Sequence, residues 1–131
     1  EDGRVGVIGF CLGGGLAFLM GLDESVKAVA PTYGKAPPDE LLARSCPVVG
    51  SWGGRDKVLR KEPPRVTAAL EAAGVANDLK VYPDAGHSFA NQPEGHDISR
   101  TLARPYMAIE YNEAAAEDTW SRIEAFFAEH V

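Results

Sequence analysis

The sequence has only two cysteines, Cys11 and Cys46, too few for a disulfide-stabilised scaffold in 131 residues. No apolar run approaches the roughly 18 residues that a membrane span needs, and glycines interrupt the longest candidate, Leu12 to Leu22. Blocks of like charge are also absent, and the net charge of -6 lacks the basic footprint of a nucleic-acid-binding protein. We therefore expect a cytoplasmic, reducing setting, with neither nucleic acid nor membrane as a partner.

The chain nevertheless has what a globular domain needs, since 45% of its residues are hydrophobic and 24% are charged. Short apolar runs alternate with segments of helical periodicity, which predicts an α/β fold with a mostly parallel sheet and flanking helices. Residues 91–112 are polar and irregular and predict a long loop with at most one helical turn; such loops are often active-site lids. Strands are expected at 4–9, 26–30, 47–53 and 79–82, and helices at 12–22, 38–43, 61–73 and 114–130.

The segment Gly9-Phe10-Cys11-Leu12-Gly13 places a cysteine between two glycines, after a predicted strand and before a predicted helix. This is the G-x-nucleophile-x-G elbow, with cysteine in the place usual for serine. Side chains at either glycine are expected to collide with the adjoining strand or helix. The helix N-terminus favours a thiolate at Cys11. A buried structural cysteine and a phosphate-cradling loop stay open as alternatives, although neither G-K-[ST] nor G-x-G-x-x-G spacing is present.

Two further residues follow later predicted strands at their carboxyl ends. Asp56 comes after the third strand and His87 after the fourth, so the chain order is nucleophile, acid, base, as in α/β-hydrolases. Singly, Asp56 could cap the helix after it, and His87 could be a loop histidine bound by backbone groups. Because strand ends of a parallel sheet meet at one rim, the combination with Cys11 predicts a catalytic triad.

The remaining metal-binding or reactive residue types indicate no second site. The candidate metal ligands lack the H-x-x-x-H or H-E-x-x-H spacing of a zinc site, so no metal is expected; they are Asp84, His87, His96 and Asp97. His130 is interpreted as a solvated residue at a helix end, and Cys46 as a small core hydrophobe.

The elbow, Gly9-Phe10-Cys11-Leu12-Gly13-Gly14, resembles that of the dienelactone hydrolase family. Thr32-Tyr33-Gly34 is similar to the family's Tyr-Gly step, and Trp52-Gly53-Gly54-Arg55-Asp56 to its acid loop. Ala85-Gly86-His87-Ser88-Phe89-Ala90 resembles its histidine loop. The likeness continues more weakly to the terminal helix.

The resemblance implies the C-terminal portion of an α/β-hydrolase fold and an enzyme that opens lactones or cleaves small carboxylic esters without a cofactor. Cys11 would attack the carbonyl to form an acyl-enzyme, His87 would transfer the proton, and Asp56 would orient the imidazole. The backbone N–H of Leu12 would stabilise the oxyanion. Substrate contacts are expected from Phe10, Tyr33, Trp52, Phe89 and Asn91.

One position departs from the family pattern. The family has an arginine shortly after the histidine loop that grips the substrate carboxylate, and Asn91 stands at the matching position. Because asparagine cannot neutralise a carboxylate, we expect a substrate less acidic than a dienelactone.

The family fold also places several strands and helices before the elbow strand, and these are not in the chain. We therefore expect residues 1–131 to be a partial domain of a larger hydrolase, or to pair through Val5 to Gly9 with another copy or a complementary N-terminal fragment. A catalytically silent α/β module that binds a ligand or a partner is the alternative function.

Overall fold

The computed structural model describes residues 3–92 and 105–131. The described residues contain a four-stranded parallel sheet in the order β1-β2-β3-β4. The α/β class predicted from the sequence is confirmed, and each predicted boundary lies within two residues of the observed one. The strands are β1 (Val5–Phe10), β2 (Val26–Thr32), β3 (Val48–Gly53) and β4 (Asn77–Tyr82), and the helices are α1 (Leu12–Met20), α2 (Asp39–Leu42), α3 (Glu62–Ala72) and α5 (Glu113–His130).

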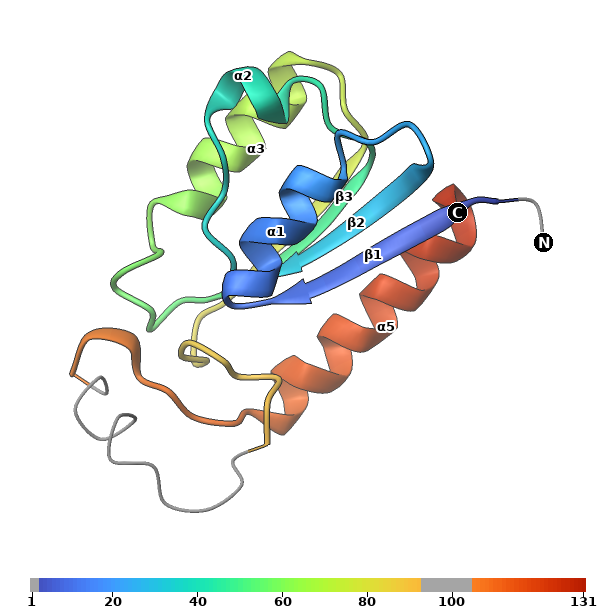
Figure 1. Cartoon of the computed structure of the whole chain (residues 1–131). Helices are drawn as coiled ribbons and strands as arrows, with labels where there is room; N and C mark the ends of the chain where they lie inside the picture. Colours follow the sequence, from blue (N-terminus) through green and yellow to red (C-terminus); the bar gives the residue numbers. More distant parts are fainter. Residues whose placement is uncertain (1–2, 93–104) are drawn as a thin grey trace.

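Helices cover both faces of the sheet. Figure 1 shows α1, α2 and α3 on one face and α5 along the other. On the first face, Phe18 of α1 and Val66 of α3 pack with Trp52 of β3 in one apolar cluster. On the second face, Ile123 and Phe126 of α5 pack against small residues of β2 and β3. Burial on both faces explains why the two central strands, β2 and β3, lack hydrophobic alternation.

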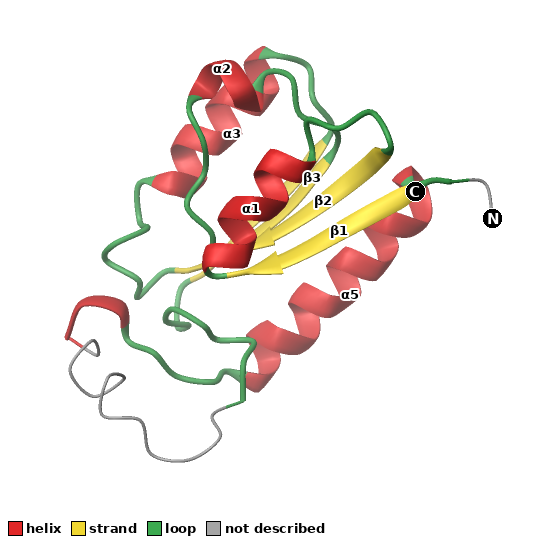
Figure 2. Cartoon of the chain, viewed as in Figure 1, coloured by secondary structure: helices red, strands yellow, loops and turns green. Residues whose placement is uncertain are grey.

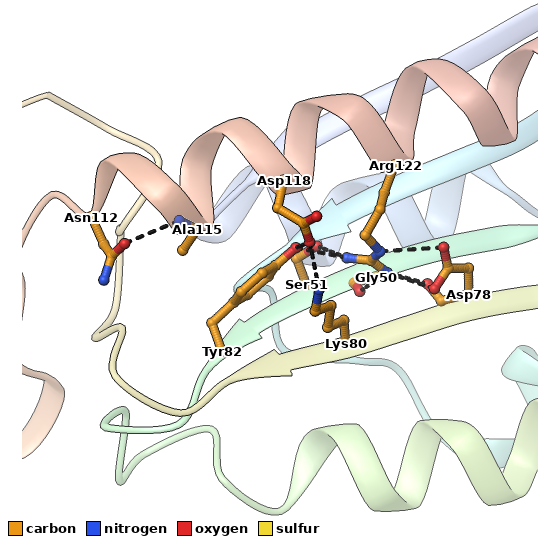
Figure 3. Close-up of polar contacts among 9 residues, drawn as sticks. All are labelled: Gly50, Ser51, Asp78, Lys80, Tyr82, Asn112, Ala115, Asp118 and Arg122. Carbon is orange, nitrogen blue, oxygen red and sulfur yellow. Dashed lines mark hydrogen bonds and ion pairs between the residues drawn. The ribbon is translucent and has the colours of Figure 1, made fainter.

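Polar groups also attach α5 to the sheet (Figure 3). The guanidinium of Arg122, whose side chain is 12% exposed, donates to Ser51 Oγ at 2.9 Å and to Tyr82 Oη at 3.1 Å. It also pairs with the Asp78 carboxylate at 2.9 Å. The helix begins after Asn112, whose side chain accepts a hydrogen bond from Ala115 N. The terminal helix is therefore held by buried polar contacts as well as by apolar packing.

All four strands run in the same direction, so their carboxyl ends meet at one rim of the sheet (Figure 2). The loops after β1, β3 and β4 emerge at this rim. The predicted long loop at 91–112 falls partly outside the described residues, which omit 93–104; residues 105–107 are helical. No helix of the described residues is both long and apolar enough to cross a membrane.

Candidate active site

Three loops bring a thiol, an imidazole and a carboxylate together at the carboxyl rim of the sheet. Cys11 Sγ lies 3.1 Å from His87 Nε2, and His87 Nδ1 lies 2.7 Å from Asp56 Oδ2. The three residues follow β1, β4 and β3 respectively, the strands after which the sequence predicted them. The contacts form one continuous chain from an exposed thiol to a buried carboxylate.

The turn that presents Cys11 has the strained backbone of an elbow. Cys11 has φ +56°, a region that non-glycine residues rarely adopt, and its N–H donates to Thr32 O at 3.0 Å. A Cβ on Gly9 would collide with the carbonyl of Gly13, so the glycine before the cysteine is required. The corresponding expectation for Gly13 is wrong, because a Cβ there would meet no described atom within 4 Å.

Asp56 contacts the imidazole of His87, and it does not cap the following helix, because the N-cap of α3 is Lys61. Asp56 Oδ2 contacts His87, while Asp56 Oδ1 accepts hydrogen bonds from Val58 N at 3.0 Å and Leu59 N at 3.1 Å. The residue is 1% exposed. The backbone donors fix the carboxylate in the orientation that it presents to the imidazole.

His87 is buried and held on several sides. Its backbone N–H donates to Met107 O at 2.7 Å, and its ring lies 5.3 Å from that of Tyr33. Burial alone would lower the pKa of His87, but the hydrogen bonds to Asp56 and Cys11 outweigh it and raise the pKa above its ordinary value. The surroundings therefore favour an imidazolium between a carboxylate and a sulfur.

A cavity of about 490 Å³ opens in front of Cys11 and His87. Leu12 lines it and begins α1, whose first N–H groups have no partner inside the helix. The lining combines loop residues with the exposed apolar side of α1. Its other residues are Gly15, Leu16, Leu19, Tyr33, Lys35, Ala36, Pro37, Leu59 and Met107.

Of the predicted substrate contacts, Tyr33 lines this cavity. It has φ +39°, its hydroxyl donates to Asn91 Oδ1 at 2.9 Å, and burial raises its pKa. Asn91 itself is exposed and is not part of the cavity lining. Phe10 also lies outside the lining and packs against Tyr33 and Trp120.

The structure corrects two of the predicted substrate contacts. Trp52 is 1% exposed within the α1 and α3 side of the core, and its Nε1 donates to Gly34 O at 3.0 Å. Phe89 is fully buried between the rings of Tyr33 and Tyr82. Both side chains support loops of the site from behind and do not line the cavity.

The residues considered for other roles lie apart from the triad. Cys46 is half-buried, and burial raises its pKa. His130 was expected to be solvated, but its ring packs 4.2 Å from that of Phe126. Within residues 3–92 and 105–131, no three His, Cys, Asp or Glu side chains gather as metal ligands do. His96 and Asp97 lie outside the described residues.

The sequence did not single out the residues that shape the cavity walls. Lys35 directly follows the Tyr33-Gly34 step, so its position in the sequence could have indicated that it lies near the site. Leu16 and Leu19 line the cavity because they lie on the exposed side of α1. Met107 belongs to the segment predicted as a loop, and no pattern in that segment marked it.

Solved structures with α/β-hydrolase folds are similar to this chain. The structure named m3DLH superposes with a TM-score of 0.75 at 22% identity, over 99% of this chain and 53% of its own. MGS-M1, an alpha/beta hydrolase enzyme from a deep-sea metagenome library, superposes with a TM-score of 0.60 at 16% identity, over 95% of this chain and 53% of its own. The fold of this chain therefore matches about half of each of these α/β-hydrolase structures.

Sequence comparisons agree. A protein of Saccharolobus solfataricus, provisionally named a carboxymethylenebutenolidase, is 32% identical over 91% of this chain and 42% of its own length. The carboxymethylenebutenolidase of Rhodococcus opacus is 29% identical over 96% of this chain and 50% of its own length. The chain thus spans about half the length of these relatives. The model of the Dienelactone hydrolase family matches residues 1–131, and the chain belongs to this family.

Proposed function

We propose that this chain provides the nucleophile, base and orienting acid of a hydrolase that opens lactones or cleaves small carboxylic esters. The main support is the continuous contact from Cys11 Sγ through the His87 ring to Asp56, beside an apolar cavity. The name of the Rhodococcus opacus relative, carboxymethylenebutenolidase, favours a lactone, because a butenolide is a lactone.

The proposed reaction proceeds through a thioester. The thiolate of Cys11 attacks the carbonyl carbon, and the carbonyl oxygen becomes an oxyanion that accepts a hydrogen bond from Leu12 N. The carbon–oxygen bond then breaks, and the leaving alkoxide takes a proton from His87. For a lactone, this alkoxide stays attached to the acyl group.

Hydrolysis of the thioester completes the cycle. The neutral His87 ring accepts a proton from water as the water oxygen attacks the thioester carbonyl. The carbon–sulfur bond breaks, the carboxylic acid leaves, and the thiolate and imidazolium return. Asp56, hydrogen-bonded to Nδ1, holds the ring so that Nε2 faces the sulfur throughout.

Ester hydrolysis by matched cysteine variants tests this proposal. We expect Cys11→Ala to lower the rate of p-nitrophenyl acetate and butenolide hydrolysis by about 10³-fold or more, because the nucleophile is lost. Cys46→Ala is the control and should retain the rate. Equal hydrolysis by both variants would contradict the proposal, and binding without hydrolysis by the unmodified chain would favour the catalytically silent module.

We also propose that another polypeptide segment covers the β1 edge. Within the described residues, β1 is an outer strand, and its Val5 and Ile8 are 45% and 38% exposed. An unpaired edge beside exposed apolar side chains is a surface that other strands pair with. A complementary N-terminal segment or a second copy of the chain would fit, and light scattering distinguishes them. A strictly monomeric chain with full esterase activity would contradict both.

A further inference from the structure

The charged residues that line the cavity are of one sign. Most of its lining is apolar, and among the lining residues that the structure describes Lys35 is the only lysine or arginine. None of these lining residues is an aspartate or a glutamate. Chain-wide, acidic residues outnumber basic ones, 19 to 13. A cation on an apolar wall of an acidic protein creates a local potential that favours an anion.

The backbone on the N-terminal side of Lys35 is fixed. The carbonyl of Gly34 accepts a hydrogen bond from the buried Trp52 Nε1 at 3.0 Å. Gly34 also packs so closely on Gly14 of α1 that a Cβ at either position would overlap backbone atoms of the other segment. The end of β2 is therefore held against the start of the nucleophile helix.

The backbone on its C-terminal side is fixed as well. The N–H of Ala36 donates to Glu62 Oε2 at 2.8 Å. The guanidinium of Arg65 donates to the carbonyls of Ala36 and Pro37, each at 3.1 Å, and pairs with Glu62 at 3.0 Å. These contacts leave the Lys35 side chain exposed at the cavity, on a backbone that both neighbours hold in place.

From this placement we infer that Lys35 determines substrate specificity: it selects acyl substrates that bear a carboxylate away from the scissile carbonyl. The inference rests on the proposed function and reverses the expectation based on Asn91. That asparagine accepts a hydrogen bond from Tyr33 and does not line the cavity. Within the described residues, the cation at the cavity therefore comes from the end of β2.

Alkylation of Cys11 tests the inference without requiring turnover. Two maleimides of matched length serve as probes, 6-maleimidohexanoic acid and its neutral amide. Peptide mass mapping reports the modification of Cys11 and Cys46 separately, so Cys46 provides an internal reference. We expect Cys11 to prefer the anionic reagent, and Lys35→Met to reduce this preference by about three- to fivefold at low salt. Lys35→Arg should preserve the preference.

A matched control separates a local effect of Lys35 from the net charge of the chain. Lys27 lies on β2 near its amino end, away from the carboxyl rim, and donates to Glu24 O. Lys27→Met removes the same charge and should leave the preference of Cys11 unchanged. An equal change in both variants would overturn the inference, as would no change in Lys35→Met while thermal melting shows that the variant is folded.

Hydrolysis distinguishes this inference from the proposed function. We expect Lys35→Met to lower the ratio of kcat/KM for the p-nitrophenyl monoester of glutarate to kcat/KM for p-nitrophenyl valerate by about three- to fivefold. Loss of preference for the anionic ester, with neutral ester hydrolysis intact, would support the inference and the proposed function. Hydrolysis of both esters with no effect of Lys35→Met would overturn the inference alone. Absence of hydrolysis with a Lys35-dependent alkylation preference would contradict the proposed function alone.

Discussion

Two charged residues, Arg122 under α5 and Lys35 at the carboxyl rim of the sheet, have different surroundings. The guanidinium of Arg122, under α5, finds its hydrogen-bond acceptors on β3 and β4 of the same chain. Lys35 follows β2 at the rim, is exposed, and lines a cavity of mostly apolar residues. A charged side chain that hydrogen-bonds to groups of its own chain contributes to stability. A charged side chain at an apolar cavity is available to bind a ligand. On this contrast we expect substitutions on the α5 side to change stability and substitutions at the rim to change activity.

The largest effect should come from the rim. We expect His87→Ala to lower kcat/KM for p-nitrophenyl acetate by about 10³-fold, because the base next to Cys11 is lost. The control is His130→Ala, which changes a histidine at the end of α5 and should preserve activity. Unchanged hydrolysis in His87→Ala would show that the rim does not contain the catalytic base.

Substitutions on the α5 side of the sheet should change the stability of the fold. We expect Arg122→Met to lower the free energy of unfolding by about 2 to 4 kcal/mol, because Ser51 and backbone carbonyls lose a buried donor. Urea denaturation measures the change, and Arg44→Met, at an exposed position, should be nearly neutral. If Arg122→Met matched this control, the polar contacts under α5 would not contribute to stability.

A smaller effect is expected at the start of α5. Asn112→Ala removes the acceptor for Ala115 N, and we expect a loss of about 1 kcal/mol of unfolding free energy. Asn112→Asp keeps a side-chain acceptor and should retain most of the stability. Equal destabilisation by both substitutions would mean that the amide group, and not the cap, is what matters.

The smallest expected effect is a dependence of folding stability on pH that comes from His87 at the rim. Because the pKa of His87 is raised in the folded chain, its charged form stabilises the fold. That contribution is complete below the ordinary histidine pKa of 6.5 and is lost as pH rises through the folded value. Urea unfolding between about pH 5.5 and about pH 8.5 should show this decline in the unmodified chain and less of it in His87→Gln. A parallel decline in both would assign it to other groups.

The sequence predicts the strands and helices well, because local sequence patterns agree with the ends of these elements in the fold. In α3 the prolines lie in the first turn, and Gly74, with φ +69°, follows the end of the helix. The strand at 26–30 was ended too early, before Pro31. Proline has no N–H to donate, yet β2 continues to Thr32 next to β1.

Motif and chain order predicted that Cys11, Asp56 and His87 come together, but they did not predict most of the cavity walls. Trp52 and Phe89 were predicted as substrate contacts, but neither lines the cavity. Trp52 lies on β3, and a strand buried on both faces does not reveal the direction of each side chain. Phe89 lies in the loop after β4, and its ring is buried against those of Tyr33 and Tyr82. Lys35 and Met107 line the cavity through contacts between segments far apart in the sequence, which no local pattern contains.

The most direct test of the rim as a catalytic site is the rate at which iodoacetamide alkylates Cys11 near neutral pH, with Cys46 measured in the same sample. We expect Cys11 to react much faster than Cys46, and His87→Ala to abolish the difference, because the imidazolium beside the sulfur stabilises the reactive thiolate. Equal, slow alkylation of the two cysteines in the unmodified chain would contradict a catalytic role for Cys11.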